Sequence, residues 1–216
     1  MVKLLIVEDE GLFRDMLKIT LSSLPNMEVV GAVSNGSAAV QSAGELAPDV
    51  ILMDIELGSE PNGIDAGRAI RREHPEIGII ILSAHKEREY VNLIASEEFF
   101  GWSYVLKQTV TDAEALVRAI EGAASGLVVM DPGVVNSMKP RKGSLTAGLT
   151  PRQQEVLAMM AQGYNNAAIA GELVLTEKSV ETYINAIYQE LGVSREHGIH
   201  PRVTATLAYL DDTQDL

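Results

Sequence analysis

The sequence predicts an α/β domain with a doubly wound, five-stranded parallel sheet, followed by a small all-α helix-turn-helix domain. In the first 125 residues, five short apolar runs alternate with longer stretches of helical spacing. This alternation is typical of a parallel sheet covered by helices. After a segment that contains Gly, Ser and Pro, the rest of the chain has helical spacing only.

The expected strands are short, and each is followed by a helix. The strands cover Lys3–Val7, Glu28–Val33, Val50–Met53, Ile77–Leu82 and Trp102–Leu106. The helices cover Leu12–Leu24, Ser37–Leu46, Ile64–His74, Arg88–Ser96 and Ala113–Ala124. Runs that are apolar at every position, such as Ile79–Leu82, predict strands buried on both faces. At the start of the fifth helix, Thr111 and Glu114 have the spacing of a capping box.

A break in this pattern divides the chain into a first domain at residues 1–125, a linker at 126–146 and a second domain at 147–212. A short helix is expected near Gly133–Met138 within the linker. Thr150, Pro151 and Gln153 predict the capped start of a helix. The helices of the second domain are expected at Pro151–Gln162, Asn165–Leu173, Glu177–Leu191 and Pro201–Leu210.

The composition is that of an acidic globular protein expected in the cytoplasm. Apolar residues make up 46% of the chain, and the formal net charge is −13. The chain contains no cysteine, which excludes a disulfide scaffold, an iron–sulfur cluster and thiol catalysis. The apolar runs near the start are too short for a signal peptide or a membrane span, so no membrane association is expected.

Both domains are acidic. Residues 1–125 hold 20 acidic against 10 basic residues, and residues 147–216 hold 9 against 4. The linker, with 3 basic residues against 1 acidic residue, is the exception. A negative net charge does not steer a protein toward nucleic acid. Charge alone therefore argues against DNA binding.

Polar residues follow four of the five expected strands, where each strand ends. Glu8 and Asp9 follow the first strand, Asp54 the third, Ser83 the fourth and Lys107 the fifth. In an open parallel sheet, ligands bind outside the carboxyl ends of the strands. One such residue alone would be an ordinary solvated side chain, but all five together indicate a site at one edge of the sheet.

These residue types suit phosphoryl transfer to a carboxylate. Three carboxylates without His or Cys fit a hard cation such as Mg²⁺, which binds oxygen. Asp54 would be the nucleophile that forms an aspartyl phosphate. Lys107 would neutralise charge on the transferred group, and Ser83 would donate a hydrogen bond to another of its oxygens.

The first domain resembles the receiver domains of two-component response regulators, which have a flavodoxin-like fold. The resemblance covers about residues 1–125, and its matching segments are Leu5–Glu10, Val50–Ile55, Ile81–Ala84 and Tyr104–Lys107. It implies that Asp54 accepts a phosphoryl group from the phosphohistidine of a sensor histidine kinase. It also implies that Mg²⁺ is held by Glu8, Asp9, Asp54 and the backbone carbonyl of Glu56.

The same resemblance assigns further roles. Ser83 and Lys107 would contact the phosphoryl group, and Ser83 with Tyr104 would form the conformational switch. Glu56 and His85 would flank the attacking water and set the dephosphorylation rate. The chain departs from the family at Gly58–Gly63, which looks one residue longer than usual, and at Glu97–Phe100, where small residues are usual.

Residues 149–192 are similar to the DNA-binding domain of LuxR-type regulators. The matching segments are Leu149–Leu157, Ala161–Ala170, Thr176–Ile184 and Leu191–Val193. With the receiver-like domain, this resembles the FixJ/NarL class of transcription regulators. It implies that a helix enters the major groove of double-stranded DNA, and a homodimer is expected on phosphorylation. The candidate DNA contacts are Lys178, Ser179, Glu181, Thr182 and Asn185.

The helix expected in the groove carries few positive charges. Val180, Ile184, Ile187 and Leu191 form one apolar stripe that is expected in the core. On the rest of the helix, Lys178 is the single basic residue, and acidic residues oppose it. Phosphate contacts usually dominate DNA affinity. Binding is therefore expected to need two protomers, or help from the linker residues Lys139, Arg141 and Lys142.

Two other functions remain open from the sequence. The acidic second domain could bind a protein partner in place of DNA. Asp54 could also be the nucleophile of a phosphatase of the haloacid-dehalogenase kind, but Ile55-Glu56-Leu57 does not match that family's Asp-x-Asp-then-Thr pattern. The chain is therefore not expected to be an enzyme. His74, His197 and His200 are isolated in the sequence and are expected to be surface or packing residues.

Overall fold

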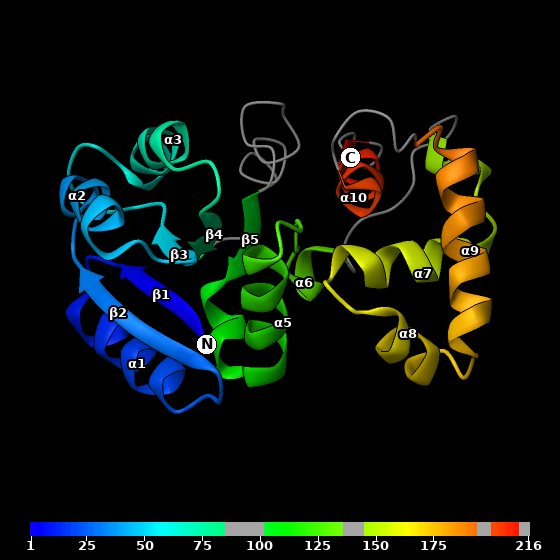
Figure 1. Ribbon diagram of the computed structural model, residues 1–216, viewed down its shortest axis with the longest axis horizontal. Coiled ribbons are helices and arrows are strands. Elements are labelled where there is room, and N and C mark those ends of the chain that lie inside the picture. Colours follow the sequence, from blue (N-terminus) through cyan, green and yellow to red (C-terminus); the bar gives the residue numbers. More distant parts are fainter. Residues whose placement is uncertain (85–101, 136–144, 194–199, 212–216) are drawn as a thin grey trace. The chain divides into compact units, whose positions relative to one another are not determined.

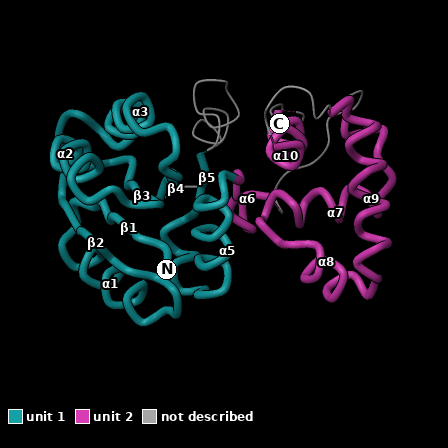
Figure 2. Tube along the Cα trace, viewed as in Figure 1, with its two compact units in different colours: residues 1–85, 101–126 teal, residues 86–100, 127–216 magenta. Residues whose placement is uncertain are grey.

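The computed structural model describes residues 1–84, 102–135, 145–193 and 200–211. These residues form two compact units, shown by their elements in Figure 1 and by colour in Figure 2. The first comprises the described residues up to Gly126, and the second those from Leu127 onward. The expected helix at Arg88–Ser96, as well as His85, Glu97–Phe100, Lys139, Arg141 and Lys142, lies outside the described residues. None of the described helices is long and apolar enough to cross a membrane.

The first unit is a five-stranded parallel sheet, which confirms the predicted fold class. The strands lie in the order β2-β1-β3-β4-β5, and every neighbouring pair is parallel. Their bounds are β1 (Val2–Val7), β2 (Met27–Val33), β3 (Val50–Asp54), β4 (Gly78–Ser83) and β5 (Trp102–Leu106). Every residue of the three strands β3, β4 and β5 is buried, as expected for strands covered on both faces.

Helices cover both faces of this sheet (Figure 1). The helices α1 (Gly11–Ser22) and α5 (Ala113–Ala124) lie on one face. The helices α2 (Gly36–Leu46) and α3 (Gly63–Glu73) lie on the other. Because β1 is flanked by β2 on one side and by β3 on the other, the chain reverses its winding direction here. Such a switch point opens a crevice at the carboxyl ends of the two strands that flank it.

The start of α5 corrects one detail of the sequence-based expectation. Thr111 does not cap this helix: it lies in the short 3₁₀ helix η2 (Lys107–Thr111), and its hydroxyl donates to the carbonyl of Gln108. The carboxylate of Asp112 instead accepts from the backbone N–H of Ala115 at 3.0 Å. A short Asp side chain directly before the helix reaches the first free N–H groups, so no capping box with Glu114 is needed.

The second unit is helical. Its elements are α6 (Pro132–Val135), η3 (Leu145–Gly148), α7 (Pro151–Ala161), α8 (Asn166–Glu172), α9 (Glu177–Glu190) and α10 (Pro201–Asp211). The expected capping box of α7 is confirmed, because Thr150 and Gln153 each accept from the other's backbone N–H. Val180, Ile184, Ile187 and Leu191 of the expected stripe are buried in the core.

Part of the segment expected as a linker packs within the second unit. Val128, Val129 and Met130 are buried, and so are Val134 and Val135 of α6. The backbone N–H of Met130 donates to the carbonyl of Ala161 at 2.8 Å, at the end of α7. Residues 127–135 therefore add apolar surface and a backbone hydrogen bond to the helical core.

Candidate functional site

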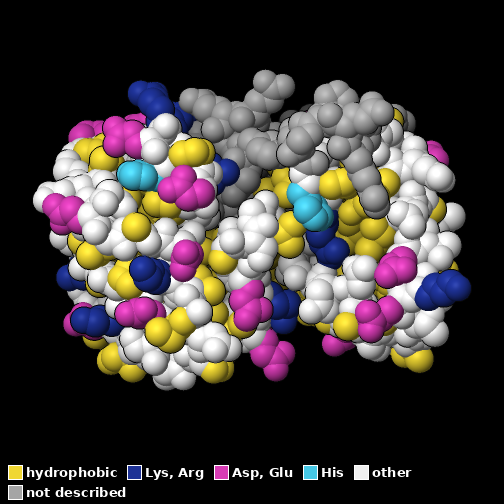
Figure 3. Space-filling model, in the orientation of Figure 1, with side chains coloured by type: hydrophobic (Ala, Val, Ile, Leu, Met, Phe, Trp, Pro, Cys, Tyr) yellow, Lys and Arg dark blue, Asp and Glu magenta, His cyan; other side chains and the backbone are white. Residues whose placement is uncertain are grey.

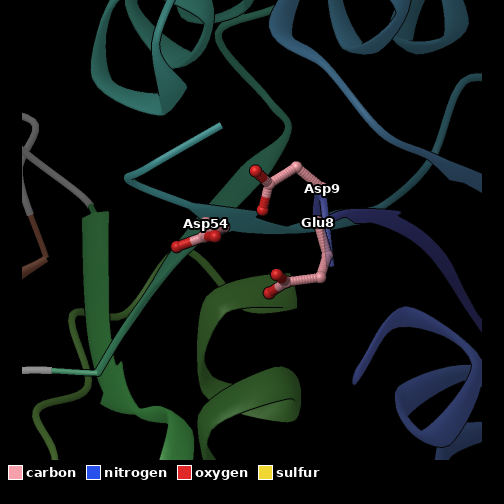
Figure 4. A group of neighbouring side chains, drawn as sticks. All are labelled: Glu8, Asp9 and Asp54. Carbon is pink, nitrogen blue, oxygen red and sulfur yellow. The ribbon is translucent and has the colours of Figure 1, made fainter. Parts of the chain in front are cut away.

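Three carboxylates meet at the carboxyl edge of the first unit's sheet (Figure 4). Glu8 and Asp9 directly follow β1, and Asp54 is the last residue of β3. The two strands are neighbours with Val7 opposite Met53, so Glu8 and Asp54 come side by side. One oxygen of each of the three carboxylates lies within 4.8 Å of the others. The oxygen-only donor set suits a hard divalent cation.

Lys107 joins two of these carboxylates. It directly follows β5, and its Nζ donates hydrogen bonds to Oδ2 of Asp54 at 2.9 Å and to Oε1 of Glu8 at 3.0 Å. Glu8 is fully buried and Asp54 is 4% exposed, whereas one fifth of the Lys107 side chain reaches solvent. Charge-assisted hydrogen bonds of this kind are about twice as strong as neutral ones. Lys107 therefore stabilises the close approach of two almost fully buried carboxylates, Glu8 and Asp54.

The electrostatics of the site favour a further cation. Burial raises the pKa of the Glu8 carboxyl; the hydrogen bond from Lys107 opposes this shift, and the charge of Asp54 adds to it. For Lys107, burial alone would lower the pKa, but its hydrogen bonds to Glu8 and Asp54 outweigh burial and raise the pKa above its usual value. Lys107 thus stays charged, but its single positive charge is outnumbered by the three carboxylates of the cluster.

The loop after β3 is folded tightly around Asp54. The backbone N–H of Glu56 donates to Oδ1 of Asp54 at 3.3 Å, which places this expected ligand residue beside the expected phosphoryl acceptor. Gly63 donates its N–H to the carbonyl of Ile55 at 3.0 Å. A Cβ on Gly63 would lie 1.8 Å from the carbonyl oxygen of Asp54, so only glycine allows this approach.

The remaining residues expected at the site lie on β4 and β5. Ser83, the last residue of β4, is buried and pairs with Leu106, the residue before Lys107. Ser83 and Lys107 therefore leave the sheet at neighbouring positions. Tyr104 is fully buried on β5 opposite Ile81, which is an inward position for the expected switch aromatic. His85 lies outside the described residues.

The first turn of α1 contributes two residues that sequence reasoning missed. One guanidinium nitrogen of Arg14 donates to the backbone carbonyls of Glu8 and Asp9, at 2.7 and 3.2 Å. The ring of Phe13 lies 5.0 Å from Nζ of Lys107, within reach of a cation–π contact. The sequence signal that could have found Phe13 and Arg14 is their closeness to Asp9, because α1 begins only two residues after it.

The second unit contains a helix-turn-helix formed by α8 and α9. The side chain of Thr176 caps α9 by accepting from the N–H of Ser179 at 3.1 Å. The buried stripe of α9 holds the helix on the core, so its opposite face is open to a partner. We refer to α9 as the recognition helix.

The five residues expected to contact DNA are not equally available. Lys178, Glu181, Thr182 and Asn185 are exposed. The Ser179 hydroxyl is hydrogen bonded to that of Thr176 at 2.8 Å, and the Thr182 hydroxyl donates to the backbone carbonyl of Lys178 at 2.9 Å. The groups best placed to read base edges are therefore the amide of Asn185 and the carboxylate of Glu181, which suit adenine and the N4 amino group of cytosine, respectively.

Comparison with known families divides the chain in the same way. Residues 4–121 match the family described as response regulator receiver domain. Residues 147–199 match the family described as bacterial regulatory proteins, luxR family. The first match alone spans more than half of the chain.

Proteins and structures similar to this chain extend over nearly its full length. It is 30% identical to the transcriptional regulatory protein DegU of Brevibacillus brevis, over 89% of both chains. It is 33% identical to the response regulator protein VraR of Staphylococcus aureus, over 89% of this chain and 91% of VraR. The structure of the RcsB response regulator of Salmonella typhimurium superposes with a TM-score of 0.56 and 21% identity, over 97% of this chain and 98% of RcsB.

Proposed function

Because the chain belongs to the response regulators that combine a receiver domain with a luxR-family DNA-binding domain, we propose that phosphorylation of Asp54 controls its binding to DNA. This family consists of transcription regulators and is not a family of enzymes. The phosphoryl donor is the phosphohistidine of a sensor histidine kinase. In the transfer, an oxygen of Asp54 forms a bond to phosphorus, the bond from phosphorus to the donor's imidazole nitrogen breaks, and that nitrogen takes up a proton.

One observation supports Asp54 as the acceptor above the other acids. It is hydrogen bonded to Lys107, at 2.9 Å, and to the backbone N–H of Glu56, at 3.3 Å. Glu8 has the corresponding contacts, to Lys107 and to the backbone N–H of Glu10, but Glu8 is fully buried, whereas Asp54 keeps 4% of its surface exposed to a donor. The oxygens of Asp54 are thus fixed, which lowers the entropic cost of attack on an incoming phosphoryl group. Lys107 is positioned to move from the carboxylates to the new phosphoryl oxygens as their charge develops.

The acidic cluster fits Mg²⁺. Glu8, Asp9, Asp54 and the backbone carbonyl of Glu56 would hold this ion, which would neutralise charge on the transferred group. The chain's own contribution is to hold the carboxylates close together at a buried strand edge. Ser83 donates its hydroxyl to a phosphoryl oxygen, and this movement is coupled to the position of Tyr104 on the next strand. By the resemblance to receiver domains, Glu56 and His85 tune the later hydrolysis of the acyl phosphate.

The output is sequence-specific binding of double-stranded DNA as a homodimer. RcsB is described as two dimers bound to two parallel DNAs, and DegU is named a transcriptional regulatory protein. The exposed face of α9, with Asn185 and Glu181, supplies the base contacts. The match to the luxR family favours DNA over a protein partner for the second unit.

The proposal is tested by treating the full-length protein with a small acyl phosphate and Mg²⁺. We expect intact-mass spectrometry to show one phosphoryl group on the wild type and none on Asp54→Asn, a nearly isosteric change. Asp65→Asn is the matched control: Asp65 is an exposed acid at the start of α3 that pairs with Arg68, and this variant is expected to be phosphorylated normally. Equal phosphorylation of Asp54→Asn and the wild type would refute the assignment.

A further inference from the structure

A pocket of about 380 Å³ lies beside the recognition helix. Its polar lining residues are Asn166 of α8, Glu181, Asn185 and Tyr188 of α9, and His200 and Arg202 at the start of α10. Glu181 and Asn185 are also the best-placed candidates for base contact. The pocket therefore opens next to the face that would enter the major groove.

Arg202 is a partly buried cation with no acidic partner among the described residues. Its guanidinium donates to the backbone carbonyl of Tyr164 and to Oδ1 of Asn166, at 3.4 Å for the latter. It forms no ion pair with a carboxylate of the described residues, whereas Arg152 of the same unit pairs with Glu155 at 2.6 Å. Burial lowers the pKa of Arg202, and Tyr188 offsets only part of this shift. A partly buried charge with neutral partners alone loses some of its hydration, and an incoming anion would offset that loss.

Two further hydrogen-bond donors face the same space. Oδ1 of Asn166 accepts from Arg202, so the amide NH₂ of this side chain is left to donate. Nδ1 of His200 accepts from the backbone N–H of Arg202 at 3.2 Å, so the proton of the neutral ring lies on Nε2. On the face shown in Figure 3, a histidine lies directly beside a basic side chain on the helical unit. Arg202, Asn166 and His200 thus offer donor groups to the pocket, whose single acidic lining residue is Glu181.

We propose that this pocket binds one phosphate group of the DNA backbone, held by Arg202, His200 and Asn166. The inference rests on the proposed function, and it adds the side chains that supply affinity for the DNA backbone. The recognition helix carries one lysine among several acids, so it cannot provide the phosphate contacts on which affinity usually depends. The pocket supplies such a contact from outside α9. Glu181, on its groove side, is left to select bases.

A purely structural role for Arg202 predicts different measurements. Arg202 also ties the start of α10 to α8, so its loss could weaken the fold without any contact to DNA. That role would lower thermal stability but leave the dependence of DNA affinity on salt unchanged. A lost phosphate contact reduces the slope of log affinity against log salt by about 0.9 per protomer.

The test uses the phosphorylated full-length protein and a DNA site selected from a genomic library. For Arg202→Met, we expect about a tenfold or greater loss of affinity and a salt slope that is shallower by roughly 1 per bound protomer. His200→Ala, at an exposed position, should lower the affinity by less than Arg202→Met, should leave the salt slope unchanged because a neutral ring releases no counterion, and should cause no loss of thermal stability. Arg72→Met removes an exposed charge on α3 of the first unit and should change neither quantity.

Neutral phosphates locate the contact. A methylphosphonate is placed at each backbone position of the DNA in turn. It should lower the DNA affinity of the wild type at one position per half-site, and the same substitution should not change the DNA affinity of Arg202→Met. If Arg202→Met does not fold, Arg202→Lys and His200→Ala are compared over the same series. The proposal is overturned if every folded variant keeps the wild-type salt slope and the wild-type methylphosphonate pattern. A wild type that binds no DNA at all would instead overturn the proposed function.

Discussion

Nζ of Lys107 lies 2.9 Å from Oδ2 of Asp54 and 2.8 Å from Oε2 of Glu8, so that one ammonium bridges two carboxylates that are almost fully buried. These residues are 53 and 99 positions from Lys107 in the sequence. The sheet brings them together because β1, β3 and β5 all end at the same edge.

Lys107→Met should expose the repulsion between Glu8 and Asp54. We expect a loss of about 2–3 kcal/mol in the free energy of unfolding without Mg²⁺. This lies below the range for a fully buried pair, because Lys107 is partly solvated. Urea denaturation should also show that Mg²⁺ restores more stability to the variant than to the wild type.

The pH of this measurement follows from the raised pKa of Lys107. A group whose pKa is raised in the folded state contributes its full stability below its unfolded-state value of 10.5 and loses it as the pH rises through the folded-state value. The full difference in the free energy of unfolding between the wild type and Lys107→Met is therefore expected at pH 7–8. Lys18→Met, on the exposed side of α1, is the control, and an equal loss in both variants would contradict the expectation.

Gly63→Ala should disturb the loop that carries the nucleophile. A Cβ would lie 1.8 Å from the carbonyl oxygen of Asp54, so the backbone must move, at a cost of at least about 2 kcal/mol. Phosphorylation by an acyl phosphate should slow as well. Gly171→Ala in α8 has open space around its Cβ and should instead stabilise the fold by roughly 0.5–1 kcal/mol. Unchanged stability of Gly63→Ala would show that this close approach is unimportant.

The side chains of Glu56 and His85 should set the lifetime of the phosphorylated state. Replacing either residue with Ala should change the dephosphorylation rate without preventing phosphorylation, because the resemblance to receiver domains assigns both residues to the path of the attacking water. The decay of purified phosphoprotein, followed by mass spectrometry, measures this rate. Identical decay in both variants and the wild type would remove both residues from this role.

Glu181→Lys should raise affinity for arbitrary DNA and reduce sequence preference. The change replaces a group that repels phosphate and selects bases with one that binds phosphate at any sequence. Binding to the selected site and to random DNA should be measured over the same salt range. Retention of the wild-type preference for the selected site would show that Glu181 does not contribute to base selection.

The fold and the receiver site followed from the sequence because each strand is an apolar run ended by a polar residue. A parallel sheet sends all strand ends to one edge, so Glu8, Asp54, Ser83 and Lys107 could be placed without coordinates. The contacts of Phe13 and Arg14 could not, because they depend on the direction in which α1 leaves β1. The prediction that Thr111 caps α5 was wrong, because the neighbouring Asp112 accepts the hydrogen bond from the first turn of the helix instead.

The pocket beside α9 had no sequence signal. His200 is isolated in the sequence and was expected to be a surface or packing residue, and Arg202 is an ordinary residue at the start of a helix. Their relation to Glu181 exists only once α8, α9 and α10 pack together. Such a site depends on tertiary packing, which the hydrophobic periodicity of a sequence does not predict.

The most direct test of the central claim is the DNA affinity of the wild type and Asp54→Asn, each measured before and after acyl-phosphate treatment. We expect the treated wild type to bind a repeated half-site, spaced about one helical turn apart, more tightly than the untreated protein and as two protomers. Asp54→Asn should show no change. Equal binding by the wild type with and without phosphate, or equal activation of Asp54→Asn, would contradict control of DNA binding through Asp54.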